Sequence, residues 1–131
     1  MKNPLNILHI EDDDKDVVLI LHELKKYWPE INHCRVEKLG ELQNALKKKW
    51  DIIISDYDLP EFDGLTALSL VRNSGSDTPF IIVSGKVPED VAVLVMRLGA
   101  TDYIMKDNLN RLAPAISREL KRAEDKEKTG I

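Results

Sequence analysis

The strongest indication of the fold of this chain is the segment Ile52-Ile53-Ile54-Ser55-Asp56-Tyr57-Asp58-Leu59-Pro60. Three β-branched apolar residues in a row indicate a strand that is buried on both faces, as in a parallel sheet covered by helices. Such a strand ends at the carboxyl edge of the sheet, where open α/β folds bind their ligands. Asp56 is therefore expected at the mouth of a cleft. On this stretch alone, the simpler interpretation of Asp56 and Asp58 as solvated turn residues before Pro60 is favoured, and the site residues described below reverse that preference.

Composition places the chain among soluble globular proteins and limits the classes of function. It has 131 residues, enough for one domain with a buried core, of which 43% are hydrophobic and 32% are charged. A net charge of -4 argues against general nucleic-acid binding. The single cysteine, Cys34, cannot form an internal disulfide, and no spacing of histidine and cysteine residues fits a zinc site.

The sequence contains neither a predicted membrane span nor a predicted secretion signal. Its longest apolar run, Val91 to Met96, is far too short to cross a bilayer. The first residues, Met1-Lys2-Asn3-Pro4, lack the apolar core of a signal peptide. We therefore expect a cytoplasmic protein that neither inserts into a membrane nor binds nucleic acid directly.

A run of four acids follows the first apolar segment. Leu5–Ile10 predicts a central strand, and it leads directly into Glu11-Asp12-Asp13-Asp14. Asp13 or Asp14 is explained as the N-cap of the following helix. That explanation leaves Glu11 and Asp12 at the tip of the strand, where they repel each other unless a positive charge compensates. Two neighbouring carboxylates, with a third from an adjacent strand, suit a hard divalent ion such as Mg²⁺.

Strands and helices alternate five times along the chain. Patterns predict strands at residues 5–10, 33–39, 52–55, 80–83 and 103–105, and helices near residues 15–28, 42–46, 65–71, 88–98 and 112–120. This alternation implies a doubly wound α/β fold, with a five-stranded parallel sheet of order 2-1-3-4-5 and helices on both faces. Strands one and three are neighbours in that order, so Glu11, Asp12 and Asp56 converge. Ser84 and Lys106 end strands four and five and point into the same cleft.

Two of the helices carry specific expectations. The first is expected to run from about Lys15 to Trp28 and to bury Val17, Leu21, Leu24 and Trp28. The fourth has no polar face over almost two turns, from Val91 to Met96. Either another element of the chain covers this helix, or it offers an apolar contact to a partner. Periodicity alone does not decide between these two interpretations.

The residues at the strand ends together suit phosphoryl transfer. Asp56 is best placed as the nucleophile, and an aspartyl phosphate is a known product of such a carboxylate. Lys106 offers a positive charge to one phosphoryl oxygen, and Ser84 offers a hydrogen bond to another, as this reaction requires. A Mg²⁺ or Mn²⁺ ion would offset the acids and contact a third oxygen. Its expected ligands are Glu11, Asp12, Asp56 and the backbone carbonyl of Asp58.

These residues also carry a resemblance to a known family. Over about residues 5–120 the sequence resembles the receiver domain of two-component response regulators, a flavodoxin-like (βα)₅ fold. The matching residues are Glu11-Asp12, Asp56 with Pro60 and Gly64 after it, Ser84-Gly85, the run from Gly99 to Tyr103, and Lys106. The resemblance implies that Asp56 accepts a phosphoryl group from a histidine kinase or a histidine phosphotransfer protein. It implies a phosphoacceptor that assists its own phosphorylation and dephosphorylation, not a conventional enzyme.

The resemblance also implies a switch and an output surface. Ser84 would shift toward the phosphate and Tyr103 would turn inward, which rearranges the surface of the fourth helix, fifth strand and fifth helix. A downstream protein, or a second copy in a homodimer, would dock on that surface. We expect the receiver domain to occupy residues 1–122 and a charged tail to occupy residues 123–131. The chain could act alone, pass the phosphate onward in a relay, or be one domain of a larger hybrid kinase or effector protein.

Two departures from the family pattern lead to further expectations. Most receivers follow the lysine with proline through a cis peptide bond, but here Asp107 follows Lys106. Because a cis bond before a residue other than proline costs about 3–4 kcal/mol, we expect a trans bond and a different loop. In the family, the positions of Asp58 and Lys86 flank the path of the hydrolytic water. We expect Asp58 and Lys86 to pair across that path and to slow hydrolysis of the phosphate.

Two other interpretations compete with a working receiver. Asp56-Tyr57-Asp58 also resembles the nucleophile motif of haloacid-dehalogenase-type phosphatases. In that family, however, the acidic pair comes last and a cap domain is common, whereas here the pair comes first and 131 residues leave no room for a cap. The other competitor is a degenerate receiver that is never phosphorylated, against which the intact Asp56, Ser84 and Lys106 argue.

Overall fold

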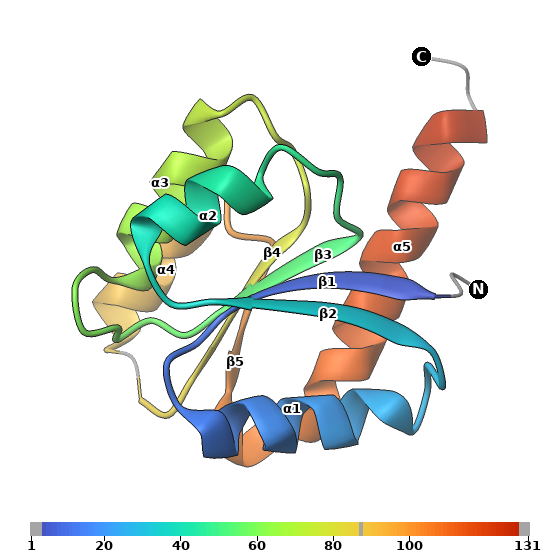
Figure 1. Cartoon of the computed structure of the whole chain (residues 1–131), viewed down its shortest axis with the longest axis horizontal. Helices are drawn as coiled ribbons and strands as arrows, with labels where there is room; N and C mark the ends of the chain where they lie inside the picture. The colour runs from blue at the N-terminus through green and yellow to red at the C-terminus, as the bar shows by residue number, and fades with distance from the viewer. Residues whose placement is uncertain (1–3, 87, 129–131) are drawn as a thin grey trace.

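The computed structural model describes residues 4–86 and 88–128 of the chain. Five parallel strands form a single sheet in the order β2-β1-β3-β4-β5 (Figure 1). The strands are β1 (Leu5–Ile10), β2 (Ile31–Val36), β3 (Ile52–Ser55), β4 (Phe80–Ser84) and β5 (Asp102–Met105). The predicted doubly wound sheet, with strands one and three as neighbours, is thereby confirmed.

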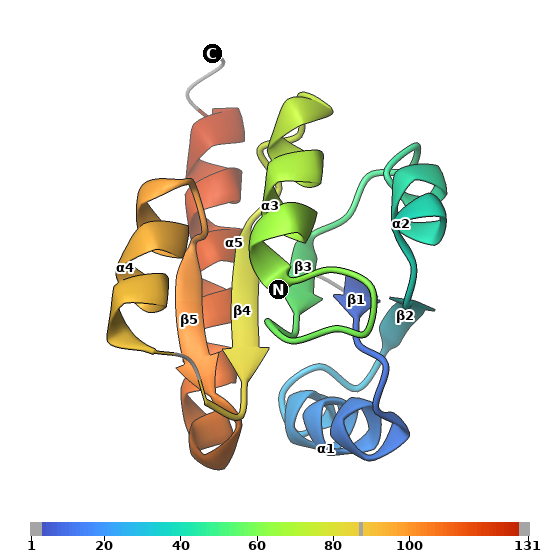
Figure 2. The ribbon, with the colours of Figure 1, turned by 90° about the vertical axis from the view of Figure 1, so that its left-hand side faces the viewer.

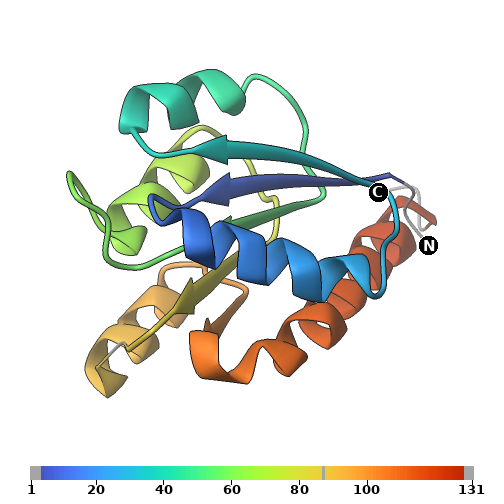
Figure 3. The same cartoon turned by 60° about the horizontal axis from the view of Figure 1, so that its bottom comes forward.

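Helices cover both faces of the sheet. The helical segments are α1 (Asp14–Lys25), α2 (Leu39–Ala45), α3 (Gly64–Asn73), α4 (Glu89–Arg97), the 3₁₀ helix η1 (Lys106–Arg111) and α5 (Leu112–Lys128). Figure 3 shows α1 and α5 on the near side of the strands, and Figure 2 shows α3 in front of the sheet with α5 behind β4 and β5. Within the described residues, no helix combines the length and the apolar character needed to cross a membrane.

Alternate residues of the strands belong to two separate hydrophobic cores. On β3, Ile52 and Ile54 pack with α1 and α5, while Ile53 packs with α2, α3 and the buried Val95 of α4. All three isoleucines are fully buried, as expected for a central strand of a parallel sheet. This double burial fixes the end of β3, and so the position of Asp56, at the carboxyl edge.

Strand β2 differs from the prediction in its bounds. It spans Ile31–Val36, not residues 33–39, because it pairs in register with β1 from Leu5 to Ile10. The next two residues, Glu37 and Lys38, do not extend the strand. Their amides donate hydrogen bonds to the Glu41 carboxylate at 2.9 and 3.1 Å. These bonds begin α2 and end the strand. The predicted edge position of β2 is correct.

Helix α1 is shorter than predicted. It ends at Lys25. Trp28 is buried, but it lies in the turn that follows the helix and not in the helix itself. On the helix the buried positions are Val17, Ile20 and Leu24, so Ile20 takes the place expected for Leu21. A helix of this length still presents one apolar stripe to the sheet.

Helix α4 is apolar but largely uncovered. Only Val95 is buried, whereas Val93, Leu94, Met96 and Leu98 are 43–49% exposed. In the part of the chain that the structure describes, no other element covers this helix, so the first of the two interpretations is wrong. The apolar surface of α4 lies beside β5, on the side of the sheet away from α5.

Helix α5 continues into the segment expected as a charged tail. It runs to Lys128, and residues 121–127 are all exposed. The expected tail is therefore helical as far as Lys128, and residues 129–131 lie outside the described residues. Pro114 occupies the first turn of α5, where it removes no hydrogen bond of the helix.

Candidate functional site

The carboxyl ends of four strands bring the predicted site residues together. Asp56 follows β3, Glu11 follows β1, Ser84 is the last residue of β4, and Lys106 follows β5. Glu11, Ser84 and Asp56 are buried, and Lys106 is partly buried. Asp12, next to Glu11, is exposed at the rim of the same site.

The carboxylate of Asp56 is held through both of its oxygens. Oδ1 accepts a hydrogen bond from the Ser84 hydroxyl at 2.9 Å and another from the Tyr57 amide at 2.7 Å. Oδ2 accepts a hydrogen bond from Lys106 Nζ at 3.1 Å. The residue is 8% exposed, so it is accessible but fixed in orientation. A fixed, accessible carboxylate with a hydroxyl and an ammonium beside it can act as a nucleophile toward an electrophile of high negative charge.

Lys106 is the only cation at the centre of this site within the described residues. Its Nζ lies 3.1 Å from Glu11 Oε1, 3.1 Å from Asp56 Oδ2 and 2.5 Å from Asp16 Oδ2. Burial alone would lower the pKa of Lys106, but the contacts with these three carboxylates raise the pKa above its usual value. The ammonium therefore stays charged at neutral pH.

Glu11, Asp12 and Asp56 form a set of oxygen ligands that fits a divalent cation. Each offers one carboxylate oxygen, and these oxygens all lie within 4.8 Å of one another. Glu11 Oε1 is buried and accepts no hydrogen bond of proper geometry, although Lys106 Nζ is near. Burial and the charge of Asp56 raise the pKa of Glu11 to about 7. A buried carboxylate oxygen that accepts no hydrogen bond of proper geometry, within a set of hard ligands, suits Mg²⁺ or Mn²⁺.

The loop after β3 folds closely over the acid site. The Gly64 amide donates to the Tyr57 carbonyl at 2.7 Å, and Asp58 forms an isolated antiparallel bridge with Asp63. A Cβ atom on Gly64 would lie 3.0 Å from the Asp56 carbonyl oxygen and 3.1 Å from Tyr57 Cα. A side chain at this position would therefore require the backbone of Asp56 and Tyr57 to shift by a few tenths of an ångström.

Three predicted residues lie at the rim and do not contact Asp56 in any interaction that the structure gives. Tyr103 is half-buried on β5, and its hydroxyl contacts Met105 Sδ at 3.5 Å. Asp58 and Lys86 are both exposed, and no ion pair joins them in the described part of the chain. Their effect on phosphate lifetime stays a prediction.

Two residues at the site, Asp16 and Arg35, were not predicted from the sequence. Asp16 lies in the first turn of α1 and contacts Lys106, ninety positions away. Arg35 on β2 donates from Nε to the Glu11 carbonyl at 2.9 Å and from Nη1 to Asp14 Oδ1 at 2.5 Å, and so holds the loop after β1. For Asp16 a signal was available, because an acid in the first turn after a strand tip lies at the same edge of the sheet.

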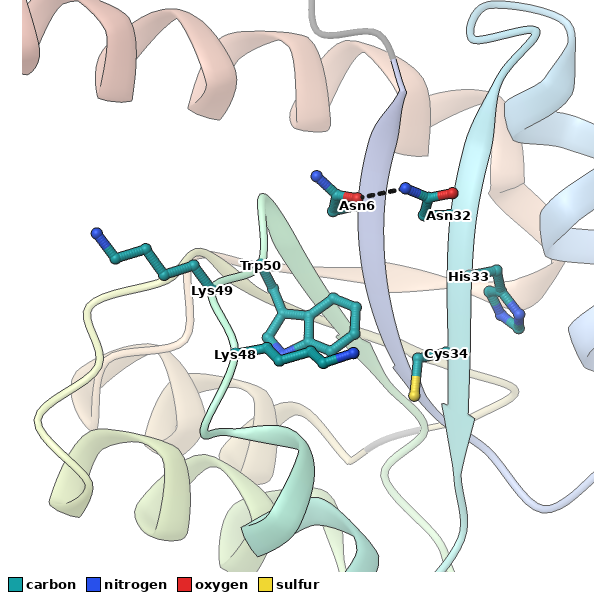
Figure 4. A pocket seen from close by; sticks show the side chains of 7 residues that line it. All are labelled: Asn6, Asn32, His33, Cys34, Lys48, Lys49 and Trp50. Carbon is teal, nitrogen blue, oxygen red and sulfur yellow. Dashed lines mark hydrogen bonds between the residues drawn. The ribbon is translucent and has the colours of Figure 1, made fainter.

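An open hollow of about 400 Å³ lies elsewhere on the molecule (Figure 4). Asn6 and Asn32, which lie near the amino ends of β1 and β2, line it and share a hydrogen bond of 2.9 Å. The indole of Trp50 lies along one side, with Lys48 next to it. The hollow is thus at the opposite end of the strands from Asp56 and takes no part in the site described above.

Comparisons with known proteins agree with this geometry. The family described as the response regulator receiver domain matches residues 7–117. Response regulator SaeR of Staphylococcus epidermidis is 33% identical over 102 residues, which cover 76% of this chain and 43% of that protein. Transcription factor SKN7 of Saccharomyces cerevisiae is 26% identical over 110 residues, covering 81% of this chain and 17% of that protein. The chain thus spans less than half the length of these curated relatives.

Solved structures show the same fold. A signal receiver domain from Vibrio parahaemolyticus has a TM-score of 0.84 and 26% identity, with 96% of this chain and 97% of that chain covered. The receiver domain of the Francisella response regulator 1452 has a TM-score of 0.79 and 24% identity, with 92% and 99% covered. At 24% identity, the likeness to the Francisella domain supports the fold alone.

Proposed function

The chain belongs to the response regulator receiver domain family, and from this premise we propose that Asp56 accepts a phosphoryl group from a histidine kinase or a histidine phosphotransfer protein. One observation carries the proposal: the Asp56 carboxylate contacts both the Ser84 hydroxyl and the Lys106 ammonium. Phosphoryl transfer depends on positioning and charge neutralisation, which are the functions that such neighbours can serve. The protein acts as a phosphoacceptor and signalling partner, and we place it in the cytoplasm.

In the proposed reaction, a carboxylate oxygen of Asp56 attacks the phosphorus atom of the donor. The bond between phosphorus and the imidazole nitrogen of the donor breaks, and its electron pair stays on that nitrogen. The product on Asp56 is an acyl phosphate. Lys106 offsets the charge of one phosphoryl oxygen, and the Ser84 hydroxyl, which donates to Asp56 Oδ1 in the free protein, donates to another.

Glu11, Asp12 and Asp56, with the backbone carbonyl of Asp58, would hold a Mg²⁺ or Mn²⁺ ion. When bound, this ion supplies positive charge to the phosphoryl oxygens. The support for this site is the buried Glu11 Oε1, which accepts no hydrogen bond of proper geometry among the described residues although the Lys106 ammonium lies 3.1 Å away. Arg35 holds the Glu11 carbonyl, and so keeps the two acids that follow β1 in place.

The proposed output is a change in the surface formed by α4, β5 and α5. The exposed apolar side chains of α4 support a protein partner or a second copy of the chain on this surface. Tyr103 lies on β5 next to that helix and would couple it to Ser84, whose neighbour in the sheet is Met105. Onward transfer of the phosphate in a relay is the other output that this site allows.

Mass spectrometry of the intact protein tests the phosphoacceptor directly. After incubation with acetyl phosphate and Mg²⁺, the wild type should gain the mass of one phosphoryl group, and Asp56→Asn should gain none. Chelation of the metal should abolish the gain. Asp77→Asn, which removes an exposed acid before the amino end of β4, at the opposite edge of the sheet from Asp56, should behave as the wild type. Phosphorylation of Asp56→Asn, or no gain in the wild type, would contradict the proposal.

A further inference from the structure

The carboxylate nearest to the Lys106 ammonium belongs to neither the proposed phosphoacceptor nor a proposed metal ligand. Asp16 Oδ2 lies 2.5 Å from Lys106 Nζ, whereas the oxygens of Glu11 and Asp56 each lie 3.1 Å away. Asp16 comes from α1 and Lys106 is the first residue of η1. This contact therefore joins two elements on the side of the sheet that α1 and α5 cover.

The start of α1 fixes the position of Asp16. The Asp13 carboxylate caps the helix by accepting hydrogen bonds from the Lys15 amide at 2.8 Å and the Asp16 amide at 3.4 Å. Acids in a first helical turn also interact favourably with the helix dipole, and this accounts for Asp14, whose side chain is 88% exposed. It does not account for Asp16, whose side chain is only 23% exposed and contacts a lysine from another element.

Lys106 needs a partner that the metal does not occupy. In the proposed function, Glu11 and Asp56 bind a divalent ion, whose charge would repel the ammonium. Asp16 is not part of the cluster of metal-ligating oxygens, so its negative charge stays available to Lys106. The backbone around Lys106 gives little support, because η1 is a short 3₁₀ segment interrupted by a non-helical Asn108.

We propose that Asp16 is a positioning residue that holds the Lys106 ammonium beside Asp56 while the metal occupies Glu11 and Asp56. The inference rests on the proposed function and adds a role for an acid on α1. Asp16→Asn keeps the size of the side chain and removes its charge. Lys106 is then held by Glu11 and Asp56 alone, so it competes with the metal and is displaced when the metal binds.

Two measurements test this role. At saturating Mg²⁺, phosphorylation of Asp16→Asn by acetyl phosphate should be slower than that of the wild type by about tenfold, as when a supporting residue of a metal site is lost. In the absence of any phosphoryl donor, a Mg²⁺ titration followed by tryptophan fluorescence or melting temperature should show weaker metal binding. Asp16→Glu, which keeps the charge, should recover part of both losses.

A double-mutant cycle shows whether Asp16 acts through the lysine. In a Lys106→Met background, Asp16→Asn should lower neither the phosphorylation rate nor the Mg²⁺ affinity further. Lys106→Gln replaces Lys106→Met if the latter does not fold, as judged by circular dichroism. Glu23→Gln is the matched control, because it removes one charge from an ion pair with Lys26 near the other end of α1. This control should leave both readouts unchanged.

The outcomes separate the inference from the proposed function. Wild-type rate and wild-type Mg²⁺ affinity in Asp16→Asn would overturn the inference, as would equal losses in the presence and absence of Lys106. If the wild type takes up no phosphoryl group, the proposed function fails. The Mg²⁺ titration of the four proteins in the cycle then still decides whether Asp16 keeps Lys106 from competing with the metal.

Discussion

At the scale of single residues, His9 is an imidazole buried beside the acid site. It is 1% exposed, its Nδ1 lies 3.0 Å from His33 Nε2, and its own Nε2 has no hydrogen-bond partner among the described residues. Burial, followed by the positive charges of His33, Arg35 and Lys106, lowers the pKa of His9 to about 3 from 6.5. The folded protein therefore keeps this ring neutral at pH values where the unfolded chain protonates it.

This difference predicts a loss of stability in mild acid. The contribution of the neutral His9 ring to the free energy of unfolding is complete above pH 6.5. It is lost as the pH falls toward 3, because the unfolded chain then binds a proton that the folded chain does not. Each pH unit in that window costs on the order of 1 kcal/mol of unfolding free energy. Urea unfolding of the wild type and of His9→Leu at pH 7, 6 and 5 measures how the unfolding free energy declines as the pH falls. We expect a clearly shallower decline for His9→Leu.

The exposed His22 of α1 provides the control for this experiment. His22→Leu also removes one imidazole, but from a solvated position, so the decline between pH 7 and pH 5 should match that of the wild type. An equal slope in His9→Leu and the wild type would show that buried His9 does not set the acid sensitivity.

At the scale of elements, the junction between β3 and α3 depends on a glycine, Gly64, at the start of α3. A methyl group at Gly64 would press on the Asp56 carbonyl oxygen and on Tyr57 Cα, both of which are backbone atoms that cannot move aside cheaply. Overpacking of this kind costs about 1–3 kcal/mol. We expect Gly64→Ala to lower the unfolding free energy by that amount in urea titrations. The added methyl group should also slow phosphorylation, because the displaced backbone carries Asp56.

Gly40 is the matched control for Gly64. It lies within α2, and a Cβ atom there would meet nothing within 4 Å. Because alanine is the better helix former, Gly40→Ala should raise the unfolding free energy by up to about 1 kcal/mol. The same substitution thus has opposite signs at two helical glycines. Equal effects at both positions would mean that the close approach at Gly64 does not constrain the loop.

Elements were predictable where their signal is local. The run Ile52–Ile54 predicts β3 correctly, and the acids after it are where the strand order places them. The bounds of β2 were not predictable, because pairing with β1 sets them and that register is a long-range property. For Asp16, the sequence could indicate its place at the carboxyl edge of the sheet, but not its contact with Lys106, since that contact depends on where α1 lies on the sheet. The composition of α4 likewise could not reveal that the helix is uncovered.

At the scale of the whole molecule, the acid site places function in conflict with stability. Three carboxylates converge on a buried edge of a chain whose net charge is already -4. The raised pKa of Glu11, about 7 against 4.5, means that the folded state disfavours its charged form. The stability that its proton gives is complete below pH 4.5 and is lost as the pH rises through 7. At pH 8 without metal, the molecule therefore bears the whole penalty.

This conflict predicts that Glu11→Gln and Mg²⁺ stabilise the protein by alternative routes. At pH 8 without metal, Glu11→Gln should unfold at higher urea than the wild type, by on the order of 1 kcal/mol, because it removes a repelled, buried charge. Saturating Mg²⁺ should stabilise the wild type by about 2.7 kcal/mol at one hundred times its dissociation constant, and the variant far less. The wild type should therefore be more stable than Glu11→Gln at saturating Mg²⁺, which reverses the order expected without metal. A wild type that Mg²⁺ stabilises no more than the same ionic strength of NaCl would contradict the assignment of Glu11 as a ligand, since screening alone would explain the gain.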